Sequence, residues 1–141
     1  MNRAEATTVL WRYFCMPTPA VSAGFTDVSA GFFTDAVDWA AGKGIVTGTT
    51  ATTFDPSGAL NRAQFVTMAW RAVGSPAGAP PNPFTDSPRG VFYTQALDWA
   101  FNAGLVNGLN PTTFAPEQPL DRLTVIVLFW RLENRVDPAV N

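Results

Sequence analysis

The sequence predicts a mainly α-helical fold, in which repeated units assemble around a central three-helix bundle. A segment at residues 44–71 recurs at 104–131, and its last part also opens the chain at 2–12. Units of this length cannot bury their apolar faces alone, so the copies must pack on one another. We therefore expect three long helices at the centre, short helices outside them and long ordered loops.

Length and composition suit one globular domain. The chain has 141 residues, of which 47% are hydrophobic and 14% charged, and a chain of this size can bury a core. We expect a single domain over 1–141, with linkers at 16–24 and 75–83 and repeat parts at 1–15, 25–74 and 84–134. The first part lacks a short helix and loop. We expect either a longer protein upstream of Met1 or a partner that supplies the missing piece.

Several functions are disfavoured by composition. The net charge is −2 with no histidine and a single cysteine, so we expect no nucleic-acid partner, no metal, no cofactor and no internal disulfide. No stretch approaches the ~20 apolar residues of a membrane span. Acidic residues are dispersed, and we therefore expect no enzyme activity. Cys15 is expected to be half-buried near a helix end.

The first helix should begin at Asn2, which can cap it, with Glu5 completing a capping box. Ala6, Val9 and Leu10 follow at helical spacing. The helix should end before Pro17, because a residue that precedes proline avoids the α region.

Each full unit should then contain a short helix. Thr34 is expected to cap a helix over 35–43, and Gly44 stands where a left-handed glycine closes a helix with a Schellman motif. Thr94 and Gly104 repeat both signals in the second unit.

The loops at 48–60 and 108–120 each hold one phenylalanine, Phe54 or Phe114, which should be buried. Asn61 and Asp121 should cap the helices that follow. Those helices are apolar over a wide arc, and Trp11, Trp70 and Trp130 are expected in the core. Residues 134–141 should fray.

These motifs together resemble the S-layer homology (SLH) repeat. They are Phe25-Thr26-Asp27-Val28, Ala36-Val37-Asp38-Trp39-Ala40, Gly44-Ile45-Val46-Thr47-Gly48, Phe54-Asp55-Pro56 and Leu60-Asn61-Arg62-Ala63-Gln64. Residues 84–131 resemble the repeat again, and 2–14 are similar to the last third of one. The resemblance covers nearly all of the chain outside the linkers and the tail.

The resemblance implies a non-catalytic module, secreted and held at the bacterial cell surface. Its repeats would assemble with pseudo-threefold symmetry around the central bundle. The grooves between them would bind secondary cell-wall polysaccharide, commonly carrying pyruvate ketals. The family's Thr-Arg-Ala-Glu motif supplies an arginine for the acidic sugar, and here the arginines are Arg3, Arg62 and Arg122. The third copy reads Asp121-Arg122-Leu123-Thr124, so it has lost the alanine and glutamate and places a carboxylate beside its arginine.

Physical chemistry supports ligand contact at these positions. Each arginine opens a helix, where free N–H groups and the helix dipole favour an anion, and a guanidinium can hold a carboxylate through two bonds. Gly48 and Gly108 would let backbone approach a ligand. Trp39 and Trp99 could stack on a sugar, and Asp27 and Asp86 could contact one.

Each of these residues also has a structural interpretation. The arginines could be solvated or paired with an internal carboxylate, and the tryptophans of the short helices could be core. Asp27 and Asp86 could cap the turn after the phenylalanine. Arg12, Arg71 and Arg131 are expected to shield an indole or to pair with an acid. An alternative function is a structural or self-assembly module, since the missing half-unit should leave an apolar flank.

Overall fold

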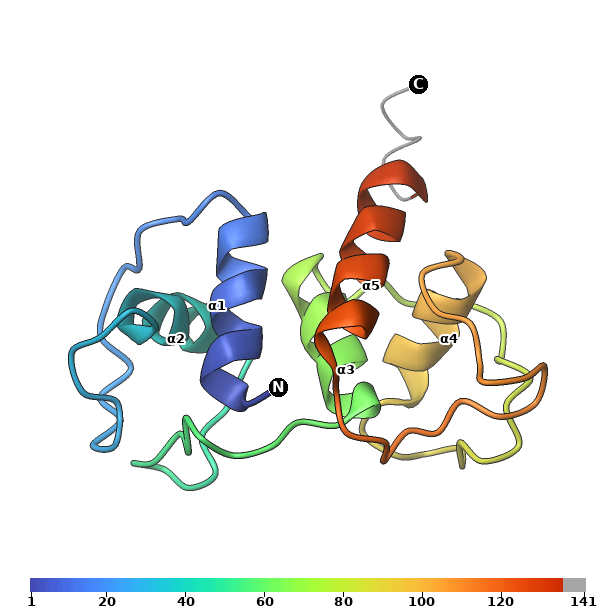
Figure 1. Cartoon of the computed structure of the whole chain (residues 1–141), viewed down its shortest axis with the longest axis horizontal. Helices are drawn as coiled ribbons and strands as arrows, with labels where there is room; N and C mark the ends of the chain where they lie inside the picture. The colour runs from blue at the N-terminus through green and yellow to red at the C-terminus, as the bar shows by residue number, and fades with distance from the viewer. Residues whose placement is uncertain (136–141) are drawn as a thin grey trace. The chain divides into compact units, whose positions relative to one another are not determined.

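The computed structural model describes residues 1–135, and its regular elements are five α-helices (Figure 1). They are α1 (Arg3–Tyr13), α2 (Thr34–Gly42), α3 (Arg62–Ala72), α4 (Thr94–Asn102) and α5 (Arg122–Arg135). Within the described residues, β-structure is limited to isolated bridges such as Asn2–Ala59 and Asn61–Pro119. The prediction of a mainly α fold is confirmed. The predicted fraying of 134–141 is wrong at 134 and 135, which belong to α5, and 136–141 lies outside the described residues.

The chain divides into two compact units, Met1–Leu60 and Asn61–Asn141. In the first unit α1 packs against α2, and in the second α3 packs against α4 (Figure 1). A fully buried phenylalanine lies in the loop of each unit, Phe54 or Phe114, as the sequence predicts. Both units therefore repeat one plan of long helix, short helix and pinned loop. The central three-helix bundle and the single domain stay predictions.

The long helices begin where their caps predict. Asn2 and Asn61 each accept a hydrogen bond from the backbone N–H three residues later, and the side chains of Glu5 and Gln64 accept one in return. Asp121 accepts a bond from the backbone N–H of Thr124 at 2.6 Å. Three caps, each worth about 1 kcal/mol, thus define the starts of α1, α3 and α5.

The short helices end as predicted but begin differently. Gly44 has φ 70°, and the N–H of Ile45 donates to the carbonyl of Ala40 at 2.8 Å, which is the Schellman geometry. Thr34 and Thr94, however, are the first helical residues and provide no side-chain cap. Their hydroxyls instead accept from the N–H groups of Gly31 and Val91 in the preceding turn. The predicted caps at Thr34 and Thr94 are wrong.

The predicted apolar rows differ in their burial. Val125, Leu128, Phe129 and Leu132 of α5 are all buried, whereas Trp130 is 61% exposed, so its predicted core position is wrong. Trp11 and Trp70 are half-buried, and their indole N–H groups donate to the carbonyls of Pro17 and Pro76. The prediction for Cys15 is also wrong, because this residue is exposed just after α1.

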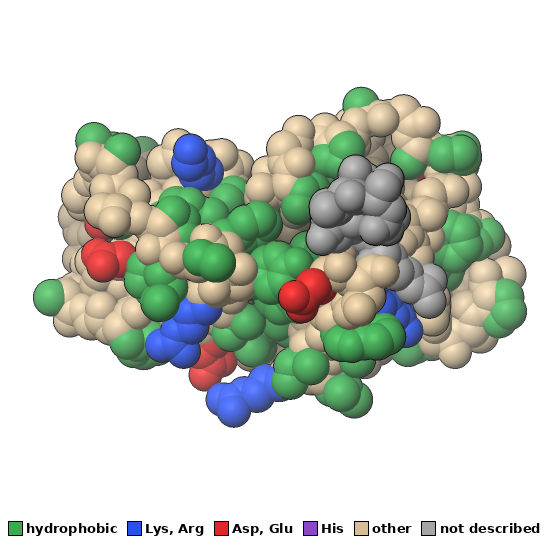
Figure 2. All heavy atoms as spheres, turned by 90° about the horizontal axis from the view of Figure 1, so that it is seen from above, with side chains coloured by type: hydrophobic (Ala, Val, Ile, Leu, Met, Phe, Trp, Pro, Cys, Tyr) green, Lys and Arg blue, Asp and Glu red, His purple; other side chains and the backbone are tan. Residues whose placement is uncertain are grey.

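Charged side chains are sparse on the surface. On the face drawn in Figure 2 they stand singly or in small groups among hydrophobic and uncharged ones. None of the helices in residues 1–135 has the length and apolar character needed to cross a bilayer.

Two glycines at the end of α2 test the Schellman motif. We expect Gly44→Ala to lower the free energy of unfolding by about 1 kcal/mol, because an L-residue at positive φ is strained. Gly42→Ala should raise it by about 0.5–1 kcal/mol, since an added Cβ meets nothing within 4 Å inside the helix. Urea titration of both variants measures the difference, and equal effects would contradict the motif.

Candidate functional site

Arg3, the first residue of α1, lies against the loop of its own unit. Its Nε donates to the carbonyl of Phe54 at 2.8 Å and its Nη2 to the carbonyl of Thr47 at 2.7 Å. The guanidinium carbon lies 4.5 Å from the centroid of the Phe54 ring, a cation–π distance. The helix start and the loop are thereby held together by one side chain.

Arg62 repeats this arrangement at the start of α3. Its Nε donates to the carbonyl of Phe114 at 3.1 Å and its Nη2 to the carbonyl of Asn107 at 3.4 Å. The guanidinium carbon is 4.6 Å from the Phe114 centroid. Burial lowers the pKa of Arg62, and the carboxylates of Asp121 and Asp86 offset part of this effect. Among the described residues no partner is found for Nη1, which remains able to donate.

Asp27 and Asp86 hold the same loops from the other side. The two oxygens of Asp27 accept from the backbone N–H groups of Phe54 and Asp55 at 2.8 and 2.7 Å. Asp86 does the same for Phe114 and Ala115 at 2.9 and 2.7 Å. The bond from Phe54 is the main cause of a lowered pKa at Asp27. Both carboxylates therefore match their structural interpretation, a cap on the turn after the phenylalanine.

Gly48 and Gly108 are required by the loop itself. A Cβ at Gly48 would lie 2.3 Å from the carbonyl oxygen of Thr50, and one at Gly108 would lie 2.3 Å from that of Asn110. Loop atoms therefore fill the space that a side chain would need, which gives both glycines a structural reason. Close approach of their backbone to a ligand stays a prediction.

The remaining predicted site residues do not gather at one place. Trp39 and Trp99 are 6% and 9% exposed, so neither indole offers a free face to a sugar. Arg122 is exposed at the start of α5. An internal carboxylate was one alternative for the arginines, but the printed bonds of Arg3 and Arg62 are to backbone carbonyls. Within the described residues, a close ion pair is formed by Arg89 and Asp98 at 2.8 Å.

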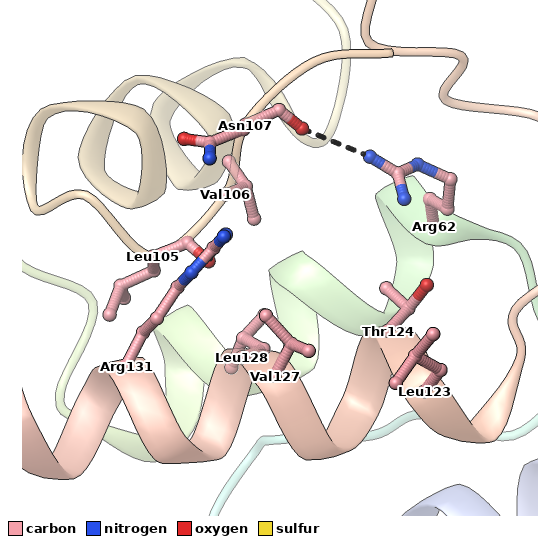
Figure 3. A pocket seen from close by; sticks show the side chains of 9 residues that line it. All are labelled: Arg62, Leu105, Val106, Asn107, Leu123, Thr124, Val127, Leu128 and Arg131. Carbon is pink, nitrogen blue, oxygen red and sulfur yellow. Dashed lines mark hydrogen bonds between the residues drawn. The ribbon is translucent and has the colours of Figure 1, made fainter.

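A cavity of about 210 Å³ lies in the second unit beside Arg62 (Figure 3). One wall is the segment that follows α4, and the other is α5. Its lining comprises Arg62, Leu105, Val106, Asn107, Leu123, Thr124, Val127, Leu128 and Arg131. Figure 3 shows the guanidinium groups of Arg62 and Arg131 at different sides of the opening, with Val127 and Leu128 on α5 below them. The cavity thus combines an apolar wall with two cations.

Arg131 is the residue of this cavity that sequence reasoning missed. Its Nη1 donates to the carbonyl of Leu105 at 3.2 Å. With the amide of Asn107 turned so that its oxygen faces the guanidinium, Nη2 donates to that oxygen at 3.2 Å. Arg131 was expected to shield an indole or to pair with an acid, and it does neither in these bonds. The sequence does carry an indication of this residue, because a Trp-Arg pair recurs in all three long helices and its arginines are Arg12, Arg71 and Arg131.

The fold defines a class of protein, a helical module built from repeats. No group of three or more His, Cys, Asp or Glu residues that could hold a metal ion occurs in residues 1–135. The chain belongs to the S-layer homology domain family, whose pattern it matches at residues 24–66 and 83–125. It is therefore a module of the cell-surface anchoring class. Residues 2–14, the predicted partial copy, lie outside the two matched ranges. Their helix α1 nevertheless begins with the same capping box as α3.

Relatives include both surface proteins and enzymes. The chain is 29% identical over 126 residues to an S-layer protein of Bacillus thuringiensis subsp. finitimus, covering 86% of this chain and 15% of that protein. It is 36% identical over 96 residues to an endoglucanase of Bacillus sp. (strain KSM-635), covering 65% of this chain and 10% of the enzyme. The chain thus spans about a tenth of the length of such relatives, and a match this short carries no enzymatic activity to it.

Protonation of Asp27 should destabilise the first unit. Because its folded-state pKa lies below the ordinary 3.8, its contribution is present above that value and is lost as pH falls through the folded pKa. Asp27→Asn should lower stability at pH 7 and reduce the pH dependence below about pH 4. Denaturant titrations between pH 7 and pH 2 measure this. Glu133→Gln, on exposed helix surface, is the control for loss of a carboxylate outside the loop.

A methyl group at Gly108 should be poorly tolerated. Gly108→Ala places its Cβ 2.3 Å from a backbone oxygen, and overpacking of this kind costs about 1–3 kcal/mol. Gly31→Ala is the matched control, since its Cβ would make only ordinary contacts at 3.7 Å or more. Thermal or urea unfolding distinguishes the variants, and a neutral Gly108→Ala would show that the loop can relax.

Proposed function

We propose that this chain anchors a protein at the bacterial cell surface by binding a carboxylate-bearing secondary cell-wall polysaccharide, with pyruvate ketals as the recognised groups. The observation that carries the proposal is the cavity between Arg62 and Arg131. The groups that line it suit a small ligand with a carboxylate and an apolar part. The cavity also lies at the start of α3, where an anion is favoured.

The two arginines would bind the carboxylate. Arg62 is held by two loop carbonyls, so its guanidinium is already oriented and little side-chain entropy is lost on binding. Arg131 is held similarly by the carbonyl of Leu105. Charge-assisted hydrogen bonds are the stronger kind, and the partly buried setting of Arg62 reduces screening by water.

The apolar wall suits the rest of a pyruvate ketal. Val127 lines the cavity and is half-buried, so its side chain could receive the methyl group of the ketal, while Thr124 could bond to a sugar hydroxyl. About 210 Å³ is small beside the ~300–1,000 Å³ of typical ligand sites. The cavity therefore suits one substituted sugar unit, and strong attachment would come from several such contacts along the polymer.

Arg3 has the same local surroundings as Arg62, so we propose it as a second ligand contact. Arg122 does not line the cavity, and Trp39 and Trp99 are left out of the proposed site because they are buried. Asp27, Asp86, Gly48 and Gly108 would act indirectly, by holding the loops that orient Arg3 and Arg62.

The proposal is tested by isothermal titration with purified pyruvylated cell-wall polysaccharide. We expect Arg131→Gln to weaken binding at least about tenfold, since one charge-assisted bond is worth roughly 1.5–3 kcal/mol. Arg12→Gln is the matched control, because Arg12 occupies the same helix position in α1, is exposed and does not line the cavity. It should bind like the unmodified chain.

Removal of the ketal distinguishes the acidic group from the sugar backbone. The same polysaccharide after mild acid treatment should bind weakly to the unmodified chain and equally weakly to Arg131→Gln. Equal affinity of the chain for treated and untreated polymer would refute recognition of pyruvate. Binding of neither polymer would refute the anchoring proposal in this form.

A further inference from the structure

The loops of the two units have the same backbone arrangement beside their arginines. The backbone N–H of Arg3 donates to the carbonyl of Gly58 at 2.8 Å, and that of Arg62 donates to the carbonyl of Gln118 at 3.0 Å. Because the backbone is matched, a difference between the two arginine sites can be assigned to the side chains around them.

Two equivalent loop positions carry different side chains. The residue after the buried phenylalanine is Asp55 in the first unit and Ala115 in the second, with φ 59° and 60°. Three positions later stand Gly58 and Gln118, and in both units the N–H of this residue donates to the carbonyl of the earlier one at 3.1 Å. The first unit therefore has a carboxylate where the second has a methyl group.

The carboxylate of Asp55 is folded over Gly58 toward Arg3. A Cβ at Gly58 would lie 2.3 Å from a carboxylate oxygen of Asp55 and 3.2 Å from Cδ of Arg3. The absence of a side chain at Gly58 thus leaves the space in which the carboxylate approaches the arginine. In the second unit this space is not needed, and the position is occupied by Gln118.

The charge of Asp55 acts on the guanidinium of Arg3. Burial lowers the pKa of Arg3, and Asp55 offsets this effect more than Asp27 does. Both oxygens of Asp27 are already engaged by backbone N–H groups of the loop. Asp55 is exposed, and among the described residues no hydrogen bond to its carboxylate is found. Its negative charge is therefore directed at Arg3 and not at a donor of the loop.

The carboxylates near Arg62 are differently placed. They belong to Asp121 and Asp86. Asp121 accepts from the backbone N–H of Thr124 at 2.6 Å and caps α5, where the helix dipole compensates its charge. Asp86 accepts from two loop N–H groups at 2.9 and 2.7 Å. Both acids near Arg62 thus have backbone donors of their own.

We propose that Asp55 is a specificity-determining residue that discriminates against a carboxylate at Arg3, so that an acidic group binds to Arg62 in preference to Arg3. The inference rests on the proposed function, because it assigns the acidic groups of the polysaccharide to one of the two arginines. A ligand carboxylate at Arg3 would be repelled by Asp55, whereas at Arg62 it would meet no such exposed, unbonded acid. Arg3 would instead receive a neutral part of the polymer, such as a sugar hydroxyl.

The test is a titration of the chain with sodium pyruvate at low salt, followed by NMR at the side-chain Nε–H groups of Arg3 and Arg62. Each of these groups donates to a loop carbonyl, so each reports on its own guanidinium. We expect Asp55→Asn to lower the Kd for pyruvate at Arg3 about two- to fivefold, the size of an exposed charge effect. The Kd at Arg62 should not change. Asparagine tolerates positive φ as aspartate does, so the loop is kept.

The reciprocal change in the second unit is the matched variant. Ala115→Asp, combined with Gln118→Gly to leave room for the carboxylate, should raise the Kd at Arg62 about two- to fivefold. Ala115→Asn with Gln118→Gly is its uncharged control and should bind pyruvate at Arg62 more tightly than the aspartate variant does. Both effects should shrink in about 0.5 M sodium chloride, since salt screens exposed charges.

Three results would overturn the proposal. They are no response of Arg3 to pyruvate in Asp55→Asn, an unchanged Kd at Arg3, and a gain that persists fully in high salt. Failure of the proposed function gives a different result, because the chain would then bind no polysaccharide in the calorimetric titration while Asp55→Asn still changed the Kd for pyruvate. Polysaccharide binding with an unchanged Kd at Arg3 would refute only the role of Asp55.

Discussion

The structure depends on a guanidinium held between a phenylalanine ring and the carbonyls of a loop. Arg3 and Arg62 each make this contact from the first position of a long helix. Burial of a cation requires acceptors, and the loop carbonyls meet this need because Asp27 and Asp86 hold the opposite side of each loop through backbone N–H groups. The helix start, the loop and the preceding segment are therefore one interdependent assembly.

This assembly explains how a structural arginine can also be a binding group. A guanidinium has five N–H donors in a fixed fork, and loop carbonyls use two of the nitrogens of Arg62. Arg62 lines a cavity whose other cation, Arg131, is restrained in the same way by the carbonyl of Leu105. Preorganised donors beside an apolar wall are the features that a small acidic ligand requires, and they arise here from the packing that holds the repeat together.

Local rules predicted much of the fold and less of the site. Capping boxes at Asn2 and Asn61, the glycine closure at Gly44 and the buried Phe54 all depend on near neighbours in sequence, and all are present. Thr34 does not cap α2, because its hydroxyl accepts a hydrogen bond from the N–H of Gly31 in the preceding turn. Trp130 resembles Trp70 in pattern, but Trp130 is 61% exposed, whereas Trp70 is half-buried and its indole N–H donates to the carbonyl of Pro76. The role of Arg131 depends on a carbonyl that is distant in sequence.

The sequence by itself determined the repeat, the starts of the long helices and the family, because caps, glycine closures and apolar periodicity act within a few residues. The tertiary structure decided which side chains are buried or bonded within the protein and which can contact a ligand. Trp39 and Trp99 became buried, Gly48 and Gly108 became constraints on the loop, and Arg62 kept one side toward a cavity. The physical reason is that exposure and hydrogen-bond partners are set by segments packed together in space, which no local pattern encodes.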